Sequence, residues 1–131
     1  MIGLDTNILI RYVTQDDAGQ ARRVDVFLAE AAEEQSRLYV DDIVLCEAVW
    51  VLGGAYRLGK SAIVEILDNV ISTANFSFDD RELLRGALAD YRAGAGDFAD
   101  YMIGRRSARA GCENTVTFDR ALRASSSFVL L

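Results

Sequence analysis

The chain has 131 residues, 51% of them hydrophobic and 26% charged, which is long enough for one domain with a proper core. Its 20 acidic residues outnumber 14 basic ones and give a net charge of −6, a balance that excludes a passive basic nucleic-acid binder. Because the chain has no histidine, imidazole catalysis and metal sites that need imidazole ligands are excluded as well.

In the first half of the chain, the hydrophobic pattern predicts two strands and four helices. They are a strand at Ile2–Asp5, a helix from Thr6 to about Val13, a longer helix capped by Asp16 or Asp17 and running to about Gln35, a strand at Arg37–Asp41, a nearly all-apolar helix over Ile43–Tyr56, and a helix that follows Gly59-Lys60-Ser61 and extends to about Ile71.

The second half continues the alternation of strands and helices. We expect a strand at Phe76–Phe78, a helix opened by a capping box of Asp79 and Glu82 and extending to about Tyr91, a loop at Gly94-Ala95-Gly96, a helix capped by Asp97 and running to about Ala110, and strands at Thr115–Phe118 and Phe128–Leu131.

Strands separated by one or two helices imply parallel pairing with right-handed crossover connections. No repeat or long linker divides the chain. We therefore expect residues 1–131 to form a single domain, a three-layer α/β/α sandwich with a parallel sheet of four to five strands.

Segments that target or anchor proteins are not expected. The longest apolar passage, residues 43–55, is interrupted by Glu47 and is too short to span a bilayer. Met1 begins directly on an expected strand with no basic leader, so we expect a cytoplasmic protein without membrane contact.

The two cysteines, Cys46 and Cys112, lie far apart in the sequence, and we expect free, buried thiols.

Five carboxylates follow predicted strands or open predicted helices. Asp5 ends the first strand and Asp119 the fourth, Glu47 lies one turn into the helix after the second strand, and Asp97 and Asp100 occupy the first turn of the helix after the glycine loop. Because ligands bind at the carboxyl edge of parallel sheets, we expect these acids to converge there.

Each acid near a helix start also has a purely structural interpretation. Asp97 is in the position of a helix cap, a role that contributes about 1 kcal/mol. Asp5 and Asp119 precede a helix and a short turn in the same way, and the helix dipole favours an acid at Asp100. For these four residues, capping stays open as the alternative.

Glu47 is harder to explain as a structural residue. Apolar neighbours surround it in the sequence, so we expect its helix to be largely buried. A buried carboxylate without a partner costs several kcal/mol, so it would be protonated, paired with an arginine or bound to a cation. A position on the rim of the helix, facing water, is the alternative.

A cluster of these acids predicts a divalent cation. Carboxylates brought within about 6 Å repel one another and raise one another's pKa, which a bound cation relieves. Oxygen ligands without histidine or cysteine select Mg²⁺ or Mn²⁺ rather than zinc. Such ions support hydrolysis of phosphodiesters, and by neutralising acids they make the acidic total compatible with a nuclease.

With these motifs the whole chain resembles a PIN-domain ribonuclease, most closely the VapC-type toxins of bacterial type II toxin–antitoxin pairs. The matching pieces are Leu4-Asp5-Thr6-Asn7, Glu47 in the apolar helix, Asp97-Phe98-Ala99-Asp100-Tyr101-Met102-Ile103, and Val116-Thr117-Phe118-Asp119. The first motif is weak alone, but all four in this order and at these spacings form a strong signal.

The resemblance implies a role for each matching residue. Asp5, Glu47, Asp100 and Asp119 would be the catalytic acids and metal ligands, with Asp97 as an auxiliary acid, and Thr6, Asn7 and Thr117 would orient the carboxylates or bound water. It further implies Mg²⁺ or Mn²⁺ as cofactor, RNA as substrate, a neutralising antitoxin protein as partner and a homodimer as assembly.

Two further surfaces follow from the side chains around these motifs. Arg105, Arg106, Arg109 and Arg120 would form a basic rim that binds RNA phosphates, unless they are ordinary solvated arginines. Phe27, Trp50, Tyr56 and Leu58 either line a groove for a partner helix or fill the core; for Trp50 we favour the core.

The leading hypothesis is therefore an Mg²⁺- or Mn²⁺-dependent endoribonuclease that acts as a toxin. Two alternatives stay open: a PIN-domain RNA-processing nuclease without an antitoxin, and a non-catalytic interaction domain in which the acids are caps. A phosphatase with Asp5 as nucleophile is disfavoured, because it would need an acid where Asn7 stands and a positioned lysine, and Lys60 is the only lysine.

Overall fold

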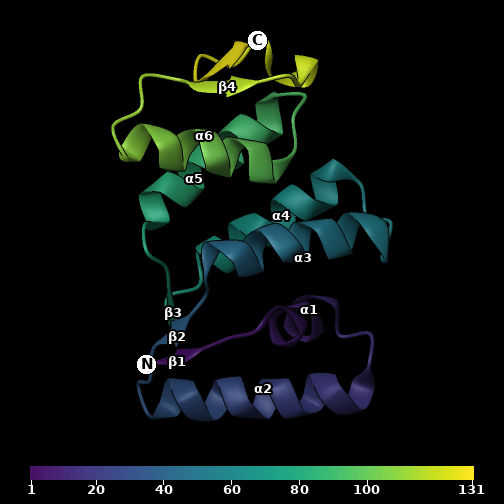
Figure 1. Ribbon diagram of the computed structural model, residues 1–131. Helices are drawn as coiled ribbons and strands as arrows, with labels where there is room; N and C mark the ends of the chain where they lie inside the picture. Colours follow the sequence, from purple (N-terminus) through teal and green to yellow (C-terminus); the bar gives the residue numbers. More distant parts are fainter. The chain divides into compact units, whose positions relative to one another are not determined.

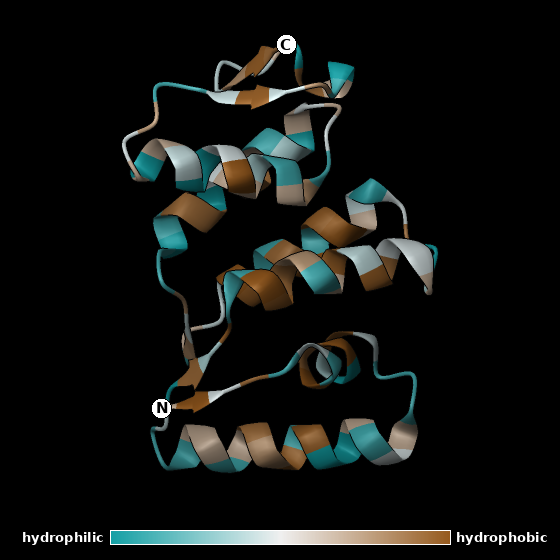
Figure 2. Cartoon of the chain, viewed as in Figure 1, coloured by the Kyte–Doolittle hydropathy of each residue, from teal (hydrophilic) through white to brown (hydrophobic).

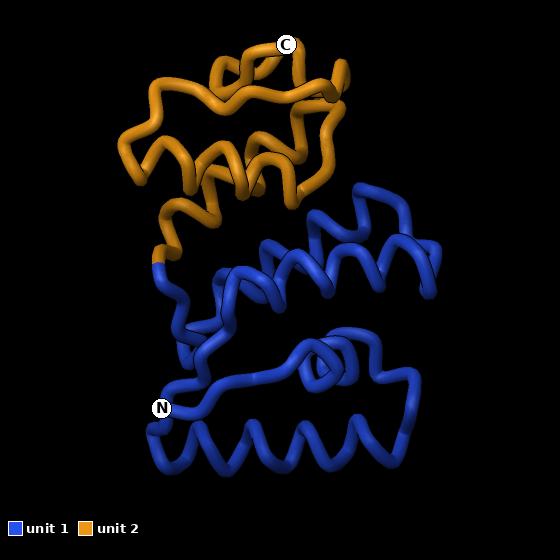
Figure 3. The backbone as a smooth tube through the Cα atoms, viewed as in Figure 1, with its two compact units in different colours: residues 1–79 blue, residues 80–131 orange.

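The computed structural model describes residues 1–131, which divide into two compact units, Met1–Asp79 and Asp80–Leu131 (Figure 3). Each unit holds its own sheet and helices. None of the helices combines the length and apolar character that a bilayer crossing requires.

The first unit contains a parallel three-stranded sheet with the order β1-β2-β3 (Figure 1). Its elements are β1 (Ile2–Gly3), α1 (Thr6–Thr14), α2 (Ala18–Glu33), β2 (Leu38–Tyr39), α3 (Asp42–Gly54), α4 (Lys60–Ile71) and β3 (Phe76–Ser77). Leu38 is in register with Ile2 on one side and Phe76 on the other. The strands occur where they were predicted but are shorter.

Aspartates begin three helices of this unit. Asp5 Oδ1 accepts a hydrogen bond from the backbone N–H of Thr6 at 2.8 Å, and Asp41 Oδ1 accepts one from Ile43 at 2.6 Å. Asp17, rather than Asp16, caps α2 by accepting from the backbone N–H of Gln20 at 2.9 Å. A carboxylate satisfies backbone donors that otherwise have no partner at a helix start, so local chemistry explains these boundaries.

The core of the first unit forms where the sheet meets the apolar faces of its helices. Figure 2 shows that apolar residues dominate α3 and α4, whereas polar residues interrupt α2. Tyr12 and Phe76 meet edge to face with ring centroids 5.9 Å apart. The prediction that Trp50 fills the core was wrong, because this residue is 82% exposed. Trp50 lies on the face of α3 opposite the buried Leu45 and Leu52.

The second unit contains a parallel two-stranded sheet and two helices. Its elements are α5 (Arg81–Ala93), α6 (Phe98–Arg109), β4 (Thr115–Thr117), the short 3-10 helix η1 (Arg120–Leu122) and β5 (Phe128–Leu130). Tyr91 of α5 packs edge to face against Phe98 of α6, with centroids 6.0 Å apart. Thr115 is in register with Phe128.

The helix cap predicted for α5 was wrong by one residue. Asp80, not Asp79, accepts the hydrogen bond from the backbone N–H of Leu83 at 2.9 Å. Asp79 instead interacts with the Tyr39 hydroxyl, and this hydrogen bond is the main reason that the pKa of Tyr39 is raised.

All five strands pair in parallel, as the crossover argument predicted, but the hydrogen bonds group them as three and two rather than in one ladder. Each strand has only two or three residues.

The two cysteine thiols are less buried than predicted. Cys112 is exposed, and Cys46 is half-buried, with desolvation raising its pKa to about 11.

Candidate metal and RNA sites

Two acids of the first unit, Asp5 and Glu47, are joined through Thr6. Asp5 Oδ1 accepts from the backbone N–H of Thr6, and the Thr6 hydroxyl donates to Glu47 Oε1 at 3.2 Å. The first acid follows β1 and the second comes from the middle of α3. Residues 41 positions or more apart in the sequence therefore meet at the start of α1, as the sequence predicted for this pair.

These residues line an open pocket of about 430 Å³. Its walls are formed by Asp5, Thr6, Asn7, Ile10, Arg11, Glu47, Val51, Ala55 and Tyr56. Two carboxylates, a hydroxyl and the Asn7 amide thus face the same space, and oxygen donors of this kind suit a hard divalent cation. The pocket is wide enough for an ion with bound water.

The expectation that Glu47 is buried was wrong. The buried face of α3 carries Val44, Leu45, Ala48 and Leu52, and Glu47 lies outside it, exposed to solvent. The rim alternative is therefore the correct one. Burial does not force Glu47 to have a cation, and an interpretation as a metal ligand has to rest on the company of Asp5 in the pocket.

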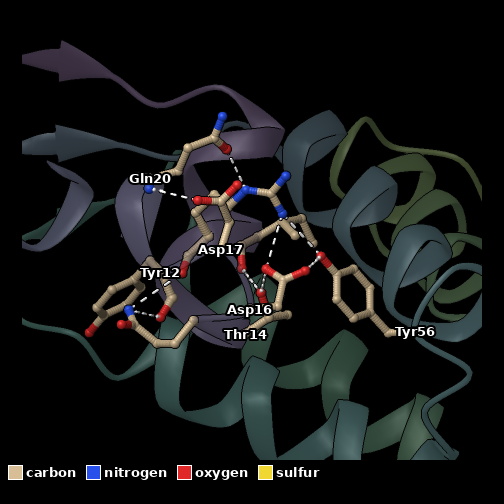
Figure 4. Close-up of polar contacts among 9 residues, drawn as sticks. Tyr12, Thr14, Asp16, Asp17, Gln20 and Tyr56 are labelled. Carbon is tan, nitrogen blue, oxygen red and sulfur yellow. Dashed lines mark hydrogen bonds and ion pairs between the residues drawn. The ribbon is translucent and has the colours of Figure 1, made fainter. Parts of the chain in front are cut away.

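The wall of this pocket is tied together by a polar network that sequence reasoning missed. Arg11 donates from Nη1 to Asp16 Oδ1 and to the Tyr56 hydroxyl, each at 3.1 Å, and from Nε to Gln20 Oε1 at 2.6 Å. Tyr56 in turn donates to Asp16 Oδ2 at 2.6 Å (Figure 4). The network joins the end of α1, the turn that follows it and Tyr56, which lies two residues past the end of α3.

Asp16 is the anionic centre of that network. The hydrogen bond from Tyr56 is the largest cause of a lowered pKa for Asp16, and the hydrogen bond from Thr14 Oγ1, at 2.8 Å, adds to it. Its charge also pairs with Arg11. Its position two residues past the end of α1, beside Asp17, was the only available signal, and it suggested capping instead.

The three acids of the second unit are engaged in local hydrogen bonds. Asp97 is the N-cap of α6, and its backbone N–H donates to Asp100 Oδ2 at 2.9 Å. Asp119 Oδ1 accepts from the backbone N–H of Ala121 at 2.9 Å, while its own N–H donates to Thr117 Oγ1 at 3.0 Å. The capping alternative is therefore realised, yet Asp100 and Asp119 each keep a second carboxylate oxygen for a ligand.

The glycine loop brings the starts of α6 and η1 together. A side chain at Gly96 would overlap the Leu122 side chain, and one at Gly94 would overlap the Tyr101 hydroxyl. The Tyr101 hydroxyl also accepts a hydrogen bond from the backbone N–H of Gly96 at 3.0 Å. The loop before Asp97 is thus packed against the short helix that Asp119 begins.

Within each unit taken alone, no three Asp, Glu or Cys side chains meet closely enough to hold a metal ion. The donors that are present are carboxylate, hydroxyl and amide oxygens. This chemistry fits Mg²⁺ or Mn²⁺ and does not fit zinc.

The predicted basic rim of α6 is partly occupied by ion pairs. Arg105 forms a two-pronged pair with Asp90, from Nε at 2.8 Å and from Nη2 at 2.9 Å, and this pair raises the pKa of Arg105. Arg109 pairs with Asp80. Arg106 is half-buried, whereas Arg120 is exposed on η1. Arg120 is thus exposed without the ion pair to an acid that Arg105 and Arg109 have.

Comparison with known proteins identifies the family of the chain. Residues 2–125 match the family model of the PIN domain. The chain is also 22% identical over 120 residues to a VapC ribonuclease of Aquifex aeolicus (strain VF5). This match covers 92% of the present chain and 88% of the relative. No solved structure matches the chain significantly. The PIN fold is a three-layer α/β/α fold, which confirms the fold class predicted from the sequence. Because the match spans nearly the whole chain, this protein belongs to the PIN-domain family.

Proposed function

We propose that this protein is an Mg²⁺- or Mn²⁺-dependent endoribonuclease that hydrolyses RNA phosphodiesters and acts as the toxin of a toxin–antitoxin pair. The observation that carries the proposal is the pocket in which Asp5 and Glu47 are joined by Thr6. In a member of the PIN-domain family, such a pair of accessible carboxylates is a reason to expect metal-dependent phosphodiester chemistry.

The residues proposed to hold the ion are Asp5, Glu47, Asp100 and Asp119, with Asp97 as an auxiliary acid. A bound divalent ion would supply an activated water and would stabilise charge on the scissile phosphate. Thr6 holds Glu47 in place by its hydrogen bond to Oε1. In the second unit, Thr117 Oγ1 accepts a hydrogen bond from the backbone N–H of Asp119 and so helps to hold the backbone that carries this acid. Asn7, in the wall of the pocket, would orient ligands or substrate.

The biological setting is proposed from the VapC relative. We propose a cognate antitoxin protein as inhibitor, RNA as substrate, a homodimer as the assembly and the cytoplasm as the location. An adjacent reading frame for a small antitoxin-like protein would support the pair. Its absence would favour the alternative of an RNA-processing nuclease without antitoxin.

The decisive experiment compares three single variants with the wild type. Asp5→Asn and Asp100→Asn remove one proposed ligand each, and Asp68→Asn is the matched control because Asp68 is exposed on α4. RNA cleavage with Mn²⁺ or Mg²⁺, and the rise in melting temperature on adding Mn²⁺, are measured for each. We expect both to be lost in the first two variants and kept in the third.

The non-catalytic alternative has one observation in its favour, namely that Asp97, Asp100 and Asp119 all take part in hydrogen bonds at helix starts. Under that alternative Mn²⁺ does not stabilise the wild type and no RNA is cleaved.

A growth experiment tests the toxin proposal. If the proposal is right, expression of the wild type in growing cells arrests growth, and expression of the Asp100→Asn variant does not.

A further inference from the structure

The second unit has a pocket of about 520 Å³ that the proposed cleavage site does not use. It lies between the end of α5 with its glycine loop, the α6 residues Tyr101 and Arg105, and the segment from η1 to the start of β5. The side chains that matter for its chemistry are Asp90, Arg105, Arg120 and Arg123, together with the hydroxyl residues Ser125, Ser126 and Ser127.

The charge of this pocket is positive although the whole chain is acidic. Asp90 is neutralised by its two-pronged pair with Arg105. Arg120 and Arg123 are exposed and have no acidic partner within the unit. Arg123 Nη1 donates only to the backbone carbonyl of Arg120, at 3.3 Å. Two positive charges therefore remain without a counter-ion at one opening.

Hydroxyl groups surround these two arginines. Ser126 is exposed, and Ser125 is half-buried, with its Oγ accepting a hydrogen bond from the backbone N–H of Ser127 at 3.3 Å. Guanidinium groups bind phosphate oxygens through two parallel N–H donors, and hydroxyls add further donors. This combination recognises a phosphate group, and the openness of the pocket to solvent suits a strand that passes through it.

We propose that this pocket binds a backbone phosphate of the RNA strand at a subsite separate from the scissile phosphodiester. The inference rests on the proposed function for its ligand, RNA. Arg120 directly follows Asp119, and the loop residues Gly94 and Ala95 shortly precede Asp97. A strand held at this subsite therefore passes next to two acids of the proposed metal site.

The test measures RNA binding under conditions that prevent cleavage. A short fluorescein-labelled single-stranded RNA of mixed sequence is titrated with the full-length protein in EDTA, at several salt concentrations. The pocket variant is Arg120→Gln/Arg123→Gln. Its matched control is Arg85→Gln/Arg92→Gln, which removes the same charge from exposed positions on α5 of the same unit.

We expect the pocket variant to bind RNA at least about tenfold more weakly. The slope of log affinity against log salt should fall in magnitude by about 0.7 for each lost phosphate contact. The control should change affinity by less than about threefold. If the double variant is unstable, Arg120→Gln alone decides, because its side chain makes no hydrogen bond in the structure. An equal loss in both double variants, or no loss in either, overturns the proposal.

Competition separates an RNA strand from smaller phosphates. Inorganic phosphate and AMP should displace the labelled RNA only at far higher concentration than unlabelled RNA; equal potency would make this a site for free phosphates and overturn the strand proposal. The Mn²⁺-dependent rise in melting temperature is measured in parallel. If it is missing in the wild type while the pocket variant still selectively loses RNA binding, the metal-dependent function fails and the RNA subsite stands.

Discussion

The two units differ in how the fold uses their acids, because the first unit contains Glu47 in addition to the helix cap Asp5. In the first unit, Glu47 lies in the middle of α3, caps no helix and has the Thr6 hydroxyl as its hydrogen-bond donor. In the second unit, Asp97 begins α6, Asp119 begins η1, and Asp100 bonds back to the Asp97 backbone. The acids of the second unit thus have structural work of their own, and Glu47 has none that stability requires.

This difference teaches how to separate a ligand from a cap. A cap satisfies a backbone donor, so its removal lowers stability whether or not it also binds a metal. An exposed mid-helix carboxylate contributes little to stability, so a loss of activity on its removal reports chemistry directly. Glu47 is therefore the cleaner residue on which to test the proposed function, whereas Asp5 and the acids of the second unit require substitutions that keep the hydrogen bonds at helix starts.

Glu47→Gln gives the largest expected effect. RNA cleavage should fall at least about 100-fold, because a neutral amide cannot balance the charge of a divalent ion. The free energy of unfolding should change by less than about 0.5 kcal/mol, since Glu47 is exposed. Steady-state cleavage assays and urea unfolding measure the two quantities. Retained cleavage with unchanged stability would remove Glu47 from the proposed site.

We predict that Asp5 and Asp100 bind the same ion. With Mn²⁺ at about 100 times its dissociation constant, ligand binding stabilises a protein by about 2.7 kcal/mol. Asp5→Asn and Asp100→Asn should each abolish most of this gain, and the double variant should lose no more than either single one. Additive losses, each covering part of the gain, would indicate independent ions. Calorimetric melting with and without Mn²⁺ measures this gain for the wild type, the two single variants and the double variant.

Many of the helix boundaries that position these acids were predictable from the sequence. Helix boundaries were close to their predicted positions because local signals determine them, as Asp5 and Asp97 illustrate at the starts of α1 and α6. The choice between neighbours was not local. Asp79 and Asp80 offer identical capping chemistry, and the contact of Asp79 with Tyr39 leaves Asp80 as the cap.

What sequence reasoning missed depends on how elements pack. The exposure of Glu47 and Trp50 follows from which face of α3 turns inward, and a helix that is apolar nearly all round does not reveal that face. The pairing of Arg105 with Asp90 joins two helices. It occurs where Gly86 leaves room for the guanidinium, since a side chain there would collide with it. Neither feature has a periodic signature.

Substitutions at Asp119 separate capping from ligation with a smaller effect. Asp119→Ala should lower the free energy of unfolding by about 1 kcal/mol at most, whereas Asp119→Ser, which keeps a cap, should cost less than half of that. Both should lose metal-dependent cleavage, because neither side chain provides a carboxylate. Cleavage that survives in the serine variant would assign Asp119 to capping alone. Asp17→Ser is the matched control, since Asp17 caps α2 and is not a proposed ligand.

The smallest expected effect concerns the network beside the pocket, and its sign follows from Asp16. The folded state lowers the pKa of this carboxyl below its ordinary value of 3.8, chiefly through the Tyr56 hydroxyl. The resulting stabilisation is fully present above pH 3.8 and is lost as the pH falls through the lowered pKa. Tyr56→Phe should therefore destabilise the protein at pH 7, and the difference from wild type should shrink in more acidic solution.

Urea unfolding at several pH values measures this difference, with Tyr12→Phe as the control. The Tyr12 ring packs on Phe76 and its hydroxyl makes no hydrogen bond in the structure, so that variant should show no comparable pH dependence. A destabilisation by Tyr56→Phe that is the same at every pH would mean that the hydroxyl acts through packing or through Arg11 and not through the charge of Asp16. Because this network forms the wall beside Asp5 and Glu47, loosening it should also weaken Mn²⁺ binding without removing a ligand, an effect smaller than that of any acid variant.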